Sequence, residues 1–379
     1  MKASERYQRH WLSFYAFTLG LLIIASNGLY FRLPDYRSPP FDFRTMRVGD
    51  LFNVYGLTRR QEGSVKLGFA ETLAAPEIGA FGNHIIQYFG GDAFYNDDPN
   101  YFFNYWYENL SLPEIYSYLR HLEQRRRLPR KLLIVQITAP NADNGNFILN
   151  WGNELPLDVV LHSYDGRASF DVFRIADYIK QVVDNYLHET FNYNTVASAL
   201  FQGGYRNRVL PRGSCQPDVP LWMSPFPYGI RSLFDSCGAL WAAYKRDGSI
   251  TESNPGQTRE APVKDEDPLG SSDRGLKPGD AFEIARYLSV INDIGQRNGV
   301  KVVFIVPPVY ESDRRDSIVN QIFNRSLKLV PSNITILDHR DLGSDPSLFQ
   351  STRHPSLKYY RMVATELARL GFIKLQPPS

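Results

Sequence analysis

The stretch EIGAFGNHIIQYFG, residues 77–90, decides the fold of this chain. Its apolar run Ile78–Phe81 predicts a short buried strand, Gly82–His84 a tight turn, and the remainder the start of a helix. In α/β enzymes, a sharp turn at the carboxyl end of a strand is a frequent position for a nucleophile. Here that position holds His84, with no serine or cysteine beside it. Whether the turn is an active site or the remnant of one is therefore the central question.

Further along the chain, apolar strands alternate with amphipathic helices. Three apolar runs are typical of buried strands, at residues 131–138, 301–310 and 333–339. Apolar residues recur at helical spacing in five other segments, at residues 111–122, 171–187, 280–291, 318–323 and 356–370. Ser111 and Glu114 also have the spacing of a capping box, which predicts that a helix begins there. This alternation predicts an α/β domain with a parallel sheet covered by helices on both faces.

The amino terminus predicts a membrane anchor. Trp11–Tyr30 contains no charged residue and, as a helix, is about 30 Å long, enough for one bilayer crossing. A cleaved signal peptide is the alternative, but Ala25–Asn27 is a poor match to a cleavage site. We therefore expect an uncleaved single span at residues 11–31. A short leading tail before a long domain usually stays inside, which predicts an inner- or plasma-membrane protein with its large domain on the periplasmic or extracytoplasmic side.

These features divide the chain into four parts. We expect a cytoplasmic tail at residues 1–10, the anchor, an extended proline-punctuated tether at residues 32–75, and the α/β domain at residues 76–379. Residues 203–279 are rich in glycine, proline and serine, and we interpret them as an irregular insert within that one domain.

The two cysteines, Cys215 and Cys237, lie in this insert. In an oxidising compartment a disulfide between them would stabilise the fold by about 3 kcal/mol. Two buried free thiols are the alternative. The cysteines have neither the spacing of a zinc site nor that of a CxxC redox motif.

Composition restricts the class of partner. The net charge of +2 is nearly balanced, and no basic stripe interleaved with aromatic residues is present, so we expect no binding of nucleic acid. Aromatic residues make up 14% of the chain, which fits large buried or partner-facing surfaces.

Four stretches resemble the SGNH (GDSL-type) hydrolase family, especially its membrane-anchored branches that act on acyl groups of cell-surface polymers. They are AFGNH (80–84), FFNYWYENLSLPEIYSYL (102–119), LLIVQITAPN (132–141) and FQSTRHPSLKYYRMVATEL (349–367). The last is similar to the D-x-x-H-P-S block that closes the family's domain. The resemblance covers most of residues 77–205 and 280–372, and it implies a flavodoxin-like, three-layer parallel-sheet domain.

The resemblance also implies where a catalytic site would lie. The family uses a serine nucleophile, a histidine base and an aspartate that orients the histidine. In this chain His84 stands at the serine position, Ser351 stands at the aspartate position, and His354 is retained. Asn109 or a neighbour stands where the family has a glycine that helps to bind the oxyanion, and Asn141 matches the family's asparagine.

These departures weaken the expected chemistry. A histidine cannot replace the serine isofunctionally, and Ser351 supplies no negative charge to stabilise an imidazolium. Asp338, Asp341 and Asp345, in the preceding loop, are alternative sources of the missing carboxylate. A metal site formed by the two histidines and a carboxylate would lack a third spaced ligand, so we expect no metal and no cofactor.

We therefore expect a non-catalytic, membrane-anchored SGNH-like domain that serves as an accessory or structural subunit of a membrane or envelope complex. Its expected partners are the membrane and other complex subunits or an envelope polysaccharide. The alternative is an esterase or O-acyltransferase acting on a cell-surface polysaccharide. A third hypothesis is that the site binds glycan without turnover.

Overall fold

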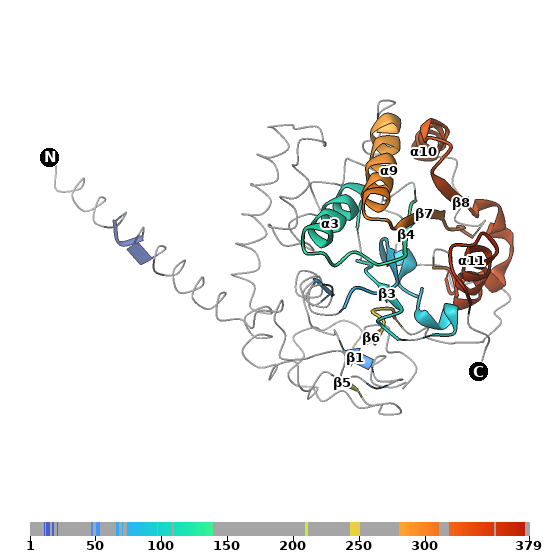
Figure 1. Cartoon of the computed structure of the whole chain (residues 1–379). Coiled ribbons are helices and arrows are strands. Elements are labelled where there is room, and N and C mark those ends of the chain that lie inside the picture. The colour runs from blue at the N-terminus through green and yellow to red at the C-terminus, as the bar shows by residue number, and fades with distance from the viewer. Residues whose placement is uncertain are drawn as a thin grey trace.

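A computed structural model gives the fold, shown in Figure 1. It describes residues 11, 13–15, 17, 18, 21, 47, 51–53, 66, 67, 70, 74–96, 98–107, 110–138, 209, 210, 243–250, 280–310, 318–351 and 354–375. The expected helix at 171–187, most of the expected insert and both cysteines, Cys215 and Cys237, lie outside these residues.

A sheet of five parallel strands forms the centre of the domain. In spatial order the strands are β3 (Phe102–Asn104), β2 (Ile78–Phe81), β4 (Leu132–Gln136), β7 (Lys301–Val306) and β8 (Thr335–Asp338). The predicted α/β fold with a parallel sheet is confirmed. Its first strand along the chain, β2, lies between the second and the third, so the strand order reverses between β2 and β4. In open α/β sheets, ligands bind beyond the carboxyl ends of the strands at such a switch point.

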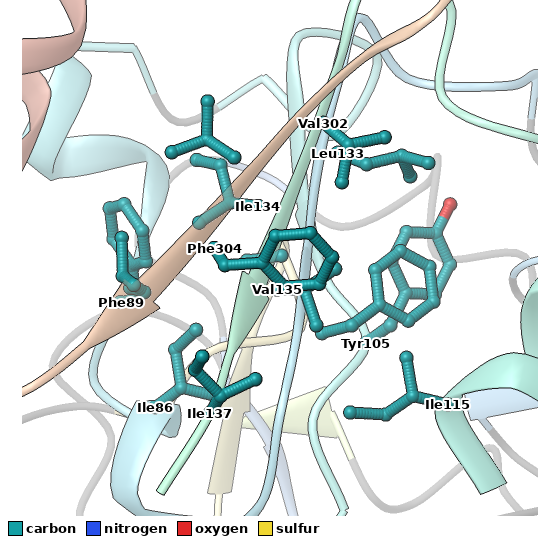
Figure 2. Close-up of a cluster of buried hydrophobic side chains, with 14 of the residues drawn as sticks. Ile86, Phe89, Tyr105, Ile115, Leu133, Ile134, Val135, Ile137, Val302 and Phe304 are labelled. Carbon is teal, nitrogen blue, oxygen red and sulfur yellow. The ribbon is translucent and has the colours of Figure 1, made fainter. Parts of the chain in front are cut away.

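The helices cover the sheet in two layers. Helices α3 (Leu112–Gln124), α9 (Asp280–Arg297) and α10 (Ile318–Leu329) pack side by side, whereas α11 (Leu357–Arg369) packs against the short 3₁₀ helix η3 (Gly91–Phe94) (Figure 1). Strand β4 is buried along its whole length. Figure 2 shows Ile134 of β4 beside Phe89 on one side of the strand, with Leu133 and Ile115 on the other. Both faces of the sheet are therefore apolar, as a doubly covered parallel sheet requires.

The described helices lie close to the positions that the sequence predicted. Helix α3 begins after Ser111, whose backbone N–H donates to the Glu114 carboxylate at 2.8 Å, so the predicted capping box is confirmed. Helices α9, α10 and α11 also lie where the apolar spacing predicted them. Strand β3 was not predicted, because it is only three residues long and lies within an aromatic run without alternation.

A second, antiparallel sheet joins distant parts of the chain. Its central strand β1 (Leu51–Asn53) comes from the expected tether, and its outer strands β5 (Val209–Leu210) and β6 (Ala243–Lys245) come from the expected insert. Neither the strands nor their pairing was predicted.

The turn after β6 connects the two sheets. The carbonyl of Asp247 accepts from the Asn104 backbone N–H at 2.8 Å, and its carboxylate accepts from the backbone N–H of Gly91. The indole N–H of Trp106 donates to the carbonyl of Gly248 at 3.1 Å. Lys245 pairs with Asp92 at 2.9 Å. The end of β3 and the helix η3 are thereby bound to the second sheet.

Part of the segment expected to be a tether lies in the core. Leu67 and Ala70 are buried there, and the ammonium of Lys66, which is 1% exposed, donates to the carbonyl of Trp106 at 2.7 Å. The same ammonium lies 3.9 Å from the centre of a Trp106 ring, a cation–π contact that favours the buried charge. The outer boundary of the tether stays a prediction.

The amino-terminal segment contains described helical residues between Trp11 and Leu21. Within the part of the chain that the structure describes, no helix combines the length and the hydropathy of a membrane span. The anchor at residues 11–31 stays a prediction.

Helix α11 is fixed to β8 by a buried histidine. His339 follows β8, and its Nδ1 lies 3.0 Å from the hydroxyl of Tyr359 while its Nε2 lies 2.8 Å from a carboxylate oxygen of Glu366. Burial, together with Glu366 and Asp338, raises the pKa of Tyr359 well above its usual value. The Tyr359 hydroxyl therefore keeps its proton at any pH near neutrality.

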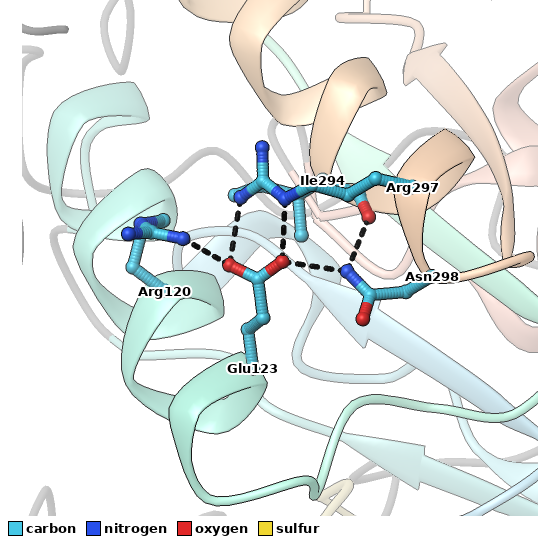
Figure 3. A network of polar contacts seen from close by, with 5 residues as sticks. All are labelled: Arg120, Glu123, Ile294, Arg297 and Asn298. Carbon is cyan, nitrogen blue, oxygen red and sulfur yellow. Dashed lines mark hydrogen bonds and ion pairs between the residues drawn. The ribbon is translucent and has the colours of Figure 1, made fainter.

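A carboxylate joins the ends of helices α3 and α9 (Figure 3). Arg297 donates to both oxygens of Glu123 at 2.6 and 2.7 Å, Asn298 donates at 2.6 Å, and Arg120 also pairs with this carboxylate. Burial favours the neutral carboxyl group, but the hydrogen bonds from Arg297 and Asn298 and the charges of both arginines outweigh it. They lower the pKa of Glu123 from 4.5 to about 2.

We predict that Glu123→Gln lowers the free energy of unfolding at pH 7 by about 1–2 kcal/mol, because it removes the charge that Arg297 binds with two hydrogen bonds. A carboxylate with a lowered pKa in the folded state stabilises fully above its unfolded pKa. Its contribution falls as the pH drops from 4.5 towards 2. Urea unfolding of both proteins at pH 7 and pH 3 would measure this difference, which should be clearly smaller at pH 3.

The control for this prediction is Glu283→Gln, because Glu283 pairs with Arg286 within one turn of the same helix α9. Such a pair contributes only a few tenths of a kcal/mol, about 0.3–0.5. An equal loss of stability in both variants, or a loss in Glu123→Gln that is independent of pH, would contradict our account of the Glu123 network.

Candidate functional site

The candidate site begins where β2 ends. The chain turns at Gly82, and one turn of 3₁₀ helix, η2 (His84–Ile86), follows. The predicted strand, turn and helix start are confirmed, although the helix is a single 3₁₀ turn. A Cβ atom at position 82 would lie 2.2 Å from Oε1 and 2.8 Å from Cβ of Gln136. Glycine is therefore required by the close approach of β2 and β4.

Two buried side chains join the carboxyl ends of β2 and β4. The backbone N–H of Asn83 donates to Oε1 of Gln136 at 3.2 Å, and the Gln136 amide donates to Oδ1 of Asn83 at 3.1 Å. The same Oδ1 accepts from the backbone N–H of Ile85 at 3.1 Å and so caps η2. This reciprocal pair lies directly at the switch point of the sheet.

Two further elements hold the segment that carries His84. The amide of Asn104, at the end of β3, donates to the carbonyls of Ile86 and Phe89 at 2.8 and 2.9 Å. From α11, the hydroxyl of Tyr360 donates to the carbonyl of Ile85 at 2.8 Å. The turn is thus fixed from β3, β4 and α11.

His354 reaches the same place from the far end of the chain. It lies in a short loop closed by a β-bridge between Phe349 and Pro355, and its carbonyl accepts from the backbone N–H of Gln350 at 2.7 Å. The rings of His84 and His354 have centroids 5.2 Å apart and are tilted by 59°. Tyr88 meets His354 edge to face, with centroids 5.9 Å apart. Both histidines are partly exposed.

Ser351 contacts His354 as its position in the sequence suggested. Its hydroxyl oxygen lies 2.8 Å from Nδ1 of His354. His84, Ser351 and His354, the three positions singled out by the resemblance, are therefore brought together in space. The two expected oxyanion residues, Asn109 and Asn141, lie outside the described residues.

The carboxylates considered as replacements for the missing aspartate make other contacts. Asp338 accepts from Nε of Arg340 at 2.7 Å; burial opposes ionisation of Asp338, but Arg340 outweighs it and lowers the pKa of this group. Asp345 accepts from the backbone N–H of Ser347 at 2.9 Å and lies 3.9 Å from Nζ of Lys358. Asp341 is exposed. The side-chain contact that the structure places at Nδ1 of His354 is thus a hydroxyl, not one of these carboxylates.

This arrangement can orient an imidazole but gives it little help as a base. A serine hydroxyl at Nδ1 orients the ring, but a hydroxyl can donate or accept, so it does not select the tautomer, and it offers no charge to stabilise an imidazolium. Across the described ranges, no three histidine, cysteine, aspartate or glutamate side chains lie close enough to hold a metal ion.

Sequence reasoning missed Tyr88, which contacts His354, and the residues that support the turn: Asn83, Asn104, Gln136 and Tyr360. Gln136 offered a signal, because it is a polar residue within the apolar run LLIVQI. A buried polar side chain at the end of a strand needs a partner, and the neighbouring strand end is the obvious place to seek one.

We predict that Gly82→Ala lowers the free energy of unfolding by about 2 kcal/mol or more, because the new methyl group displaces Gln136 and breaks its pair with Asn83. Urea unfolding would measure the loss, with the exposed Ser332→Ala as control. If the contact with Gln136 is the cause, Gln136→Ala should cost much less in the Gly82→Ala background than alone. Simple additivity of the two substitutions would show that the cause is wrong.

Comparison with known proteins gives no family for this chain. No protein-family model matches it, and no curated protein matches it. The likeness to SGNH hydrolases therefore stays a prediction.

Proposed function

We propose that this chain is a non-catalytic SGNH-like domain, anchored in a membrane by residues 11–31, that serves as an accessory or structural subunit of a membrane or envelope complex. The observation that carries the proposal is the trio at the switch point. His84 stands at the end of β2, where a nucleophile would be expected, and His354 is oriented by the hydroxyl of Ser351.

The strand order supports the SGNH-like part of this proposal. Numbered along the chain, the five parallel strands run 2-1-3-4-5, the order of flavodoxin-like sheets. In such a sheet the end of the first strand lies at the switch point, and there His84 meets His354 from the closing block of the domain. A common fold alone does not carry function, so the chemistry of the site decides the rest.

That chemistry argues against acyl transfer. An acylated imidazole hydrolyses readily and does not reproduce a serine ester, so His84 is a poor substitute for a serine nucleophile. With the Ser351 hydroxyl at Nδ1, in the place of the family's aspartate, His354 is a weak general base. The aromatic residues of the chain and the predicted anchor instead suit a subunit that docks at the membrane surface.

An assay of ester hydrolysis tests the non-catalytic part. We expect full-length protein in mild detergent, His354→Ala and Ser332→Ala to release acetate from an acetylated oligosaccharide equally slowly, within about twofold of the buffer rate. A rate at least about tenfold above buffer that is lost in His354→Ala and kept in Ser332→Ala would instead establish the alternative, an esterase or O-acyltransferase acting on a cell-surface polysaccharide.

The accessory role needs a separate measurement. We expect the native protein to leave the membrane in mild detergent as part of a stable complex, with other membrane or envelope proteins in fixed stoichiometry. Size-exclusion chromatography followed by mass spectrometry would measure this. Elution of the native protein as an isolated chain would contradict the proposed role as a subunit.

A further inference from the structure

The amino ends of the parallel strands lie at the edge of the sheet opposite the candidate site. Strands β4 and β7 begin there side by side, because the backbone N–H of Lys301 donates to the carbonyl of Lys131 at 3.0 Å. Helices α3, α9 and α10 each end shortly before the next strand begins, so they also end at this edge. Helix α11 ends there too, since the carbonyl of Gly371 accepts from Nζ of Lys301 at 3.3 Å. We call this surface, residues 124–132, 297–301, 328–335 and 369–374, the amino edge.

The amino edge gathers exposed cations from separate segments of the chain. Four of them, Arg125, Arg126, Arg130 and Lys131, lie between α3 and β4. The other segments contribute Lys301, Lys328, Arg369 and Lys374, which are likewise exposed. Arg297 adds no excess charge, because Glu123 neutralises it (Figure 3). The sequence shows no single basic stripe because folding, not spacing, brings these side chains to one surface.

Helix dipoles account for part of this charge. A cation in the last turn of a helix interacts favourably with the macrodipole, and Lys328 of α10 and Arg369 of α11 have that position. The effect falls off within the last turn. Lys131 precedes β4, Lys301 begins β7 and Lys374 lies beyond the end of α11, so helix dipoles do not explain these three.

The opposite edge has a different charge. At the end of β8 the exposed carboxylates Asp338, Asp341 and Asp345 outnumber the cations Arg340 and Lys358. The nearly balanced net charge of +2 therefore conceals an uneven distribution, with the positive charge concentrated at the amino edge. An anionic surface would attract this edge in preference to the other.

Two exposed apolar side chains lie among the cations. Leu329, the last residue of α10, is 39% exposed, and Leu370, directly after α11, is 43% exposed. Each follows a cation in the sequence, Lys328 and Arg369. Cations beside exposed apolar groups suit a lipid surface, where the charges meet headgroups and the apolar groups enter the acyl boundary. A soluble polyanion would use the cations but not the leucines.

We propose that the amino edge is a docking surface for a bilayer that contains anionic lipid. This rests on the proposed function, in which an anchor at residues 11–31 holds the domain near a membrane. Fully extended, residues 32–50 would span about 60 Å, which leaves the choice of face to the surface of the domain. Each cation close to an anionic bilayer raises partitioning about fivefold. Docked in this way, the carboxyl edge with the candidate site faces away from the lipid.

Two lysines provide a matched probe of this orientation. The side chains of Lys131, at the amino edge, and Lys358, near the candidate site, are each 64% exposed, and each lies near one carboxylate. Full-length protein would be placed in nanodiscs of phosphatidylcholine alone, or of an equal mixture of phosphatidylcholine and phosphatidylglycerol. A membrane-impermeant acetylating reagent would then modify exposed lysines, and mass spectrometry would measure the rate at each.

We expect the rate at Lys131, relative to Lys358, to be about fivefold or more lower in the anionic nanodiscs than in the neutral ones. The difference should vanish in about 1 M salt, where the Debye length is about 3 Å.

A pair of charge reversals tests the surface itself. Arg126→Glu, at the amino edge, should restore most of the lost rate at Lys131. Arg361→Glu is the matched control, because Arg361 is equally an exposed arginine but lies beside Tyr95, at 5.6 Å from its ring centre, away from the amino edge. It should leave the protection of Lys131 unchanged. Both variants would first be shown to unfold at the same urea concentration as the wild type.

An equal ratio of the two rates in both kinds of nanodisc would overturn the docking surface and leave the proposed function standing. Protection of Lys131 in the native complex, but not in nanodiscs, would overturn it in favour of an acidic protein surface. Loss of the protein from neutral nanodiscs with protection of Lys131 in anionic ones would contradict the anchor and support the docking surface. Loss from both would contradict both.

Discussion

The approach of β2 to β4 at Gly82 is the constraint on which the site depends. Because position 82 has no side chain, Gln136 can lie against the backbone and exchange hydrogen bonds with Asn83. That exchange ties together the two strands between which the order of the sheet reverses. The position of His84 follows from it, since Asn83 also caps the short helix in which His84 stands.

Helix α11 positions His354, the second histidine of the site. Tyr359, in its first turn, contacts His339 beyond the end of β8, whereas its neighbour Tyr360 reaches the helix of His84. The Tyr360 ring also stacks on Phe89, with centroids 4.5 Å apart. One helix thus fixes the edge of the sheet and the switch point at once, and the loop of His354 immediately precedes it. The meeting of His84 and His354 is a property of the packed domain, not of either segment alone.

The elements that could be predicted are those whose sequence signal lies within the element itself. The capping box of Ser111 and Glu114 and the apolar run of β4 carry their signal within a few residues, and both are observed. Strands β1, β5 and β6 have only two or three residues each, and they exist through pairing with distant partners. The contacts of Asn104 and Tyr360 likewise join residues that only the folded structure brings together, so the local sequence does not indicate them. His84, Ser351 and His354 were singled out together only through the proposed likeness to SGNH hydrolases, because spacing within the sequence carries no information on contacts between such distant residues.

The antiparallel sheet has a consequence for the order of events during synthesis. Its central strand, β1, is made early, yet Leu51 pairs on one side with Leu210 and on the other with Lys245. Those partners emerge from the ribosome only after well over half of the chain has been translated. Until then residues 51–53 have neither of the partners that make them a strand. Contacts of such high sequence separation form slowly. A nascent chain of this protein therefore cannot complete this sheet until residue 245 has been synthesised.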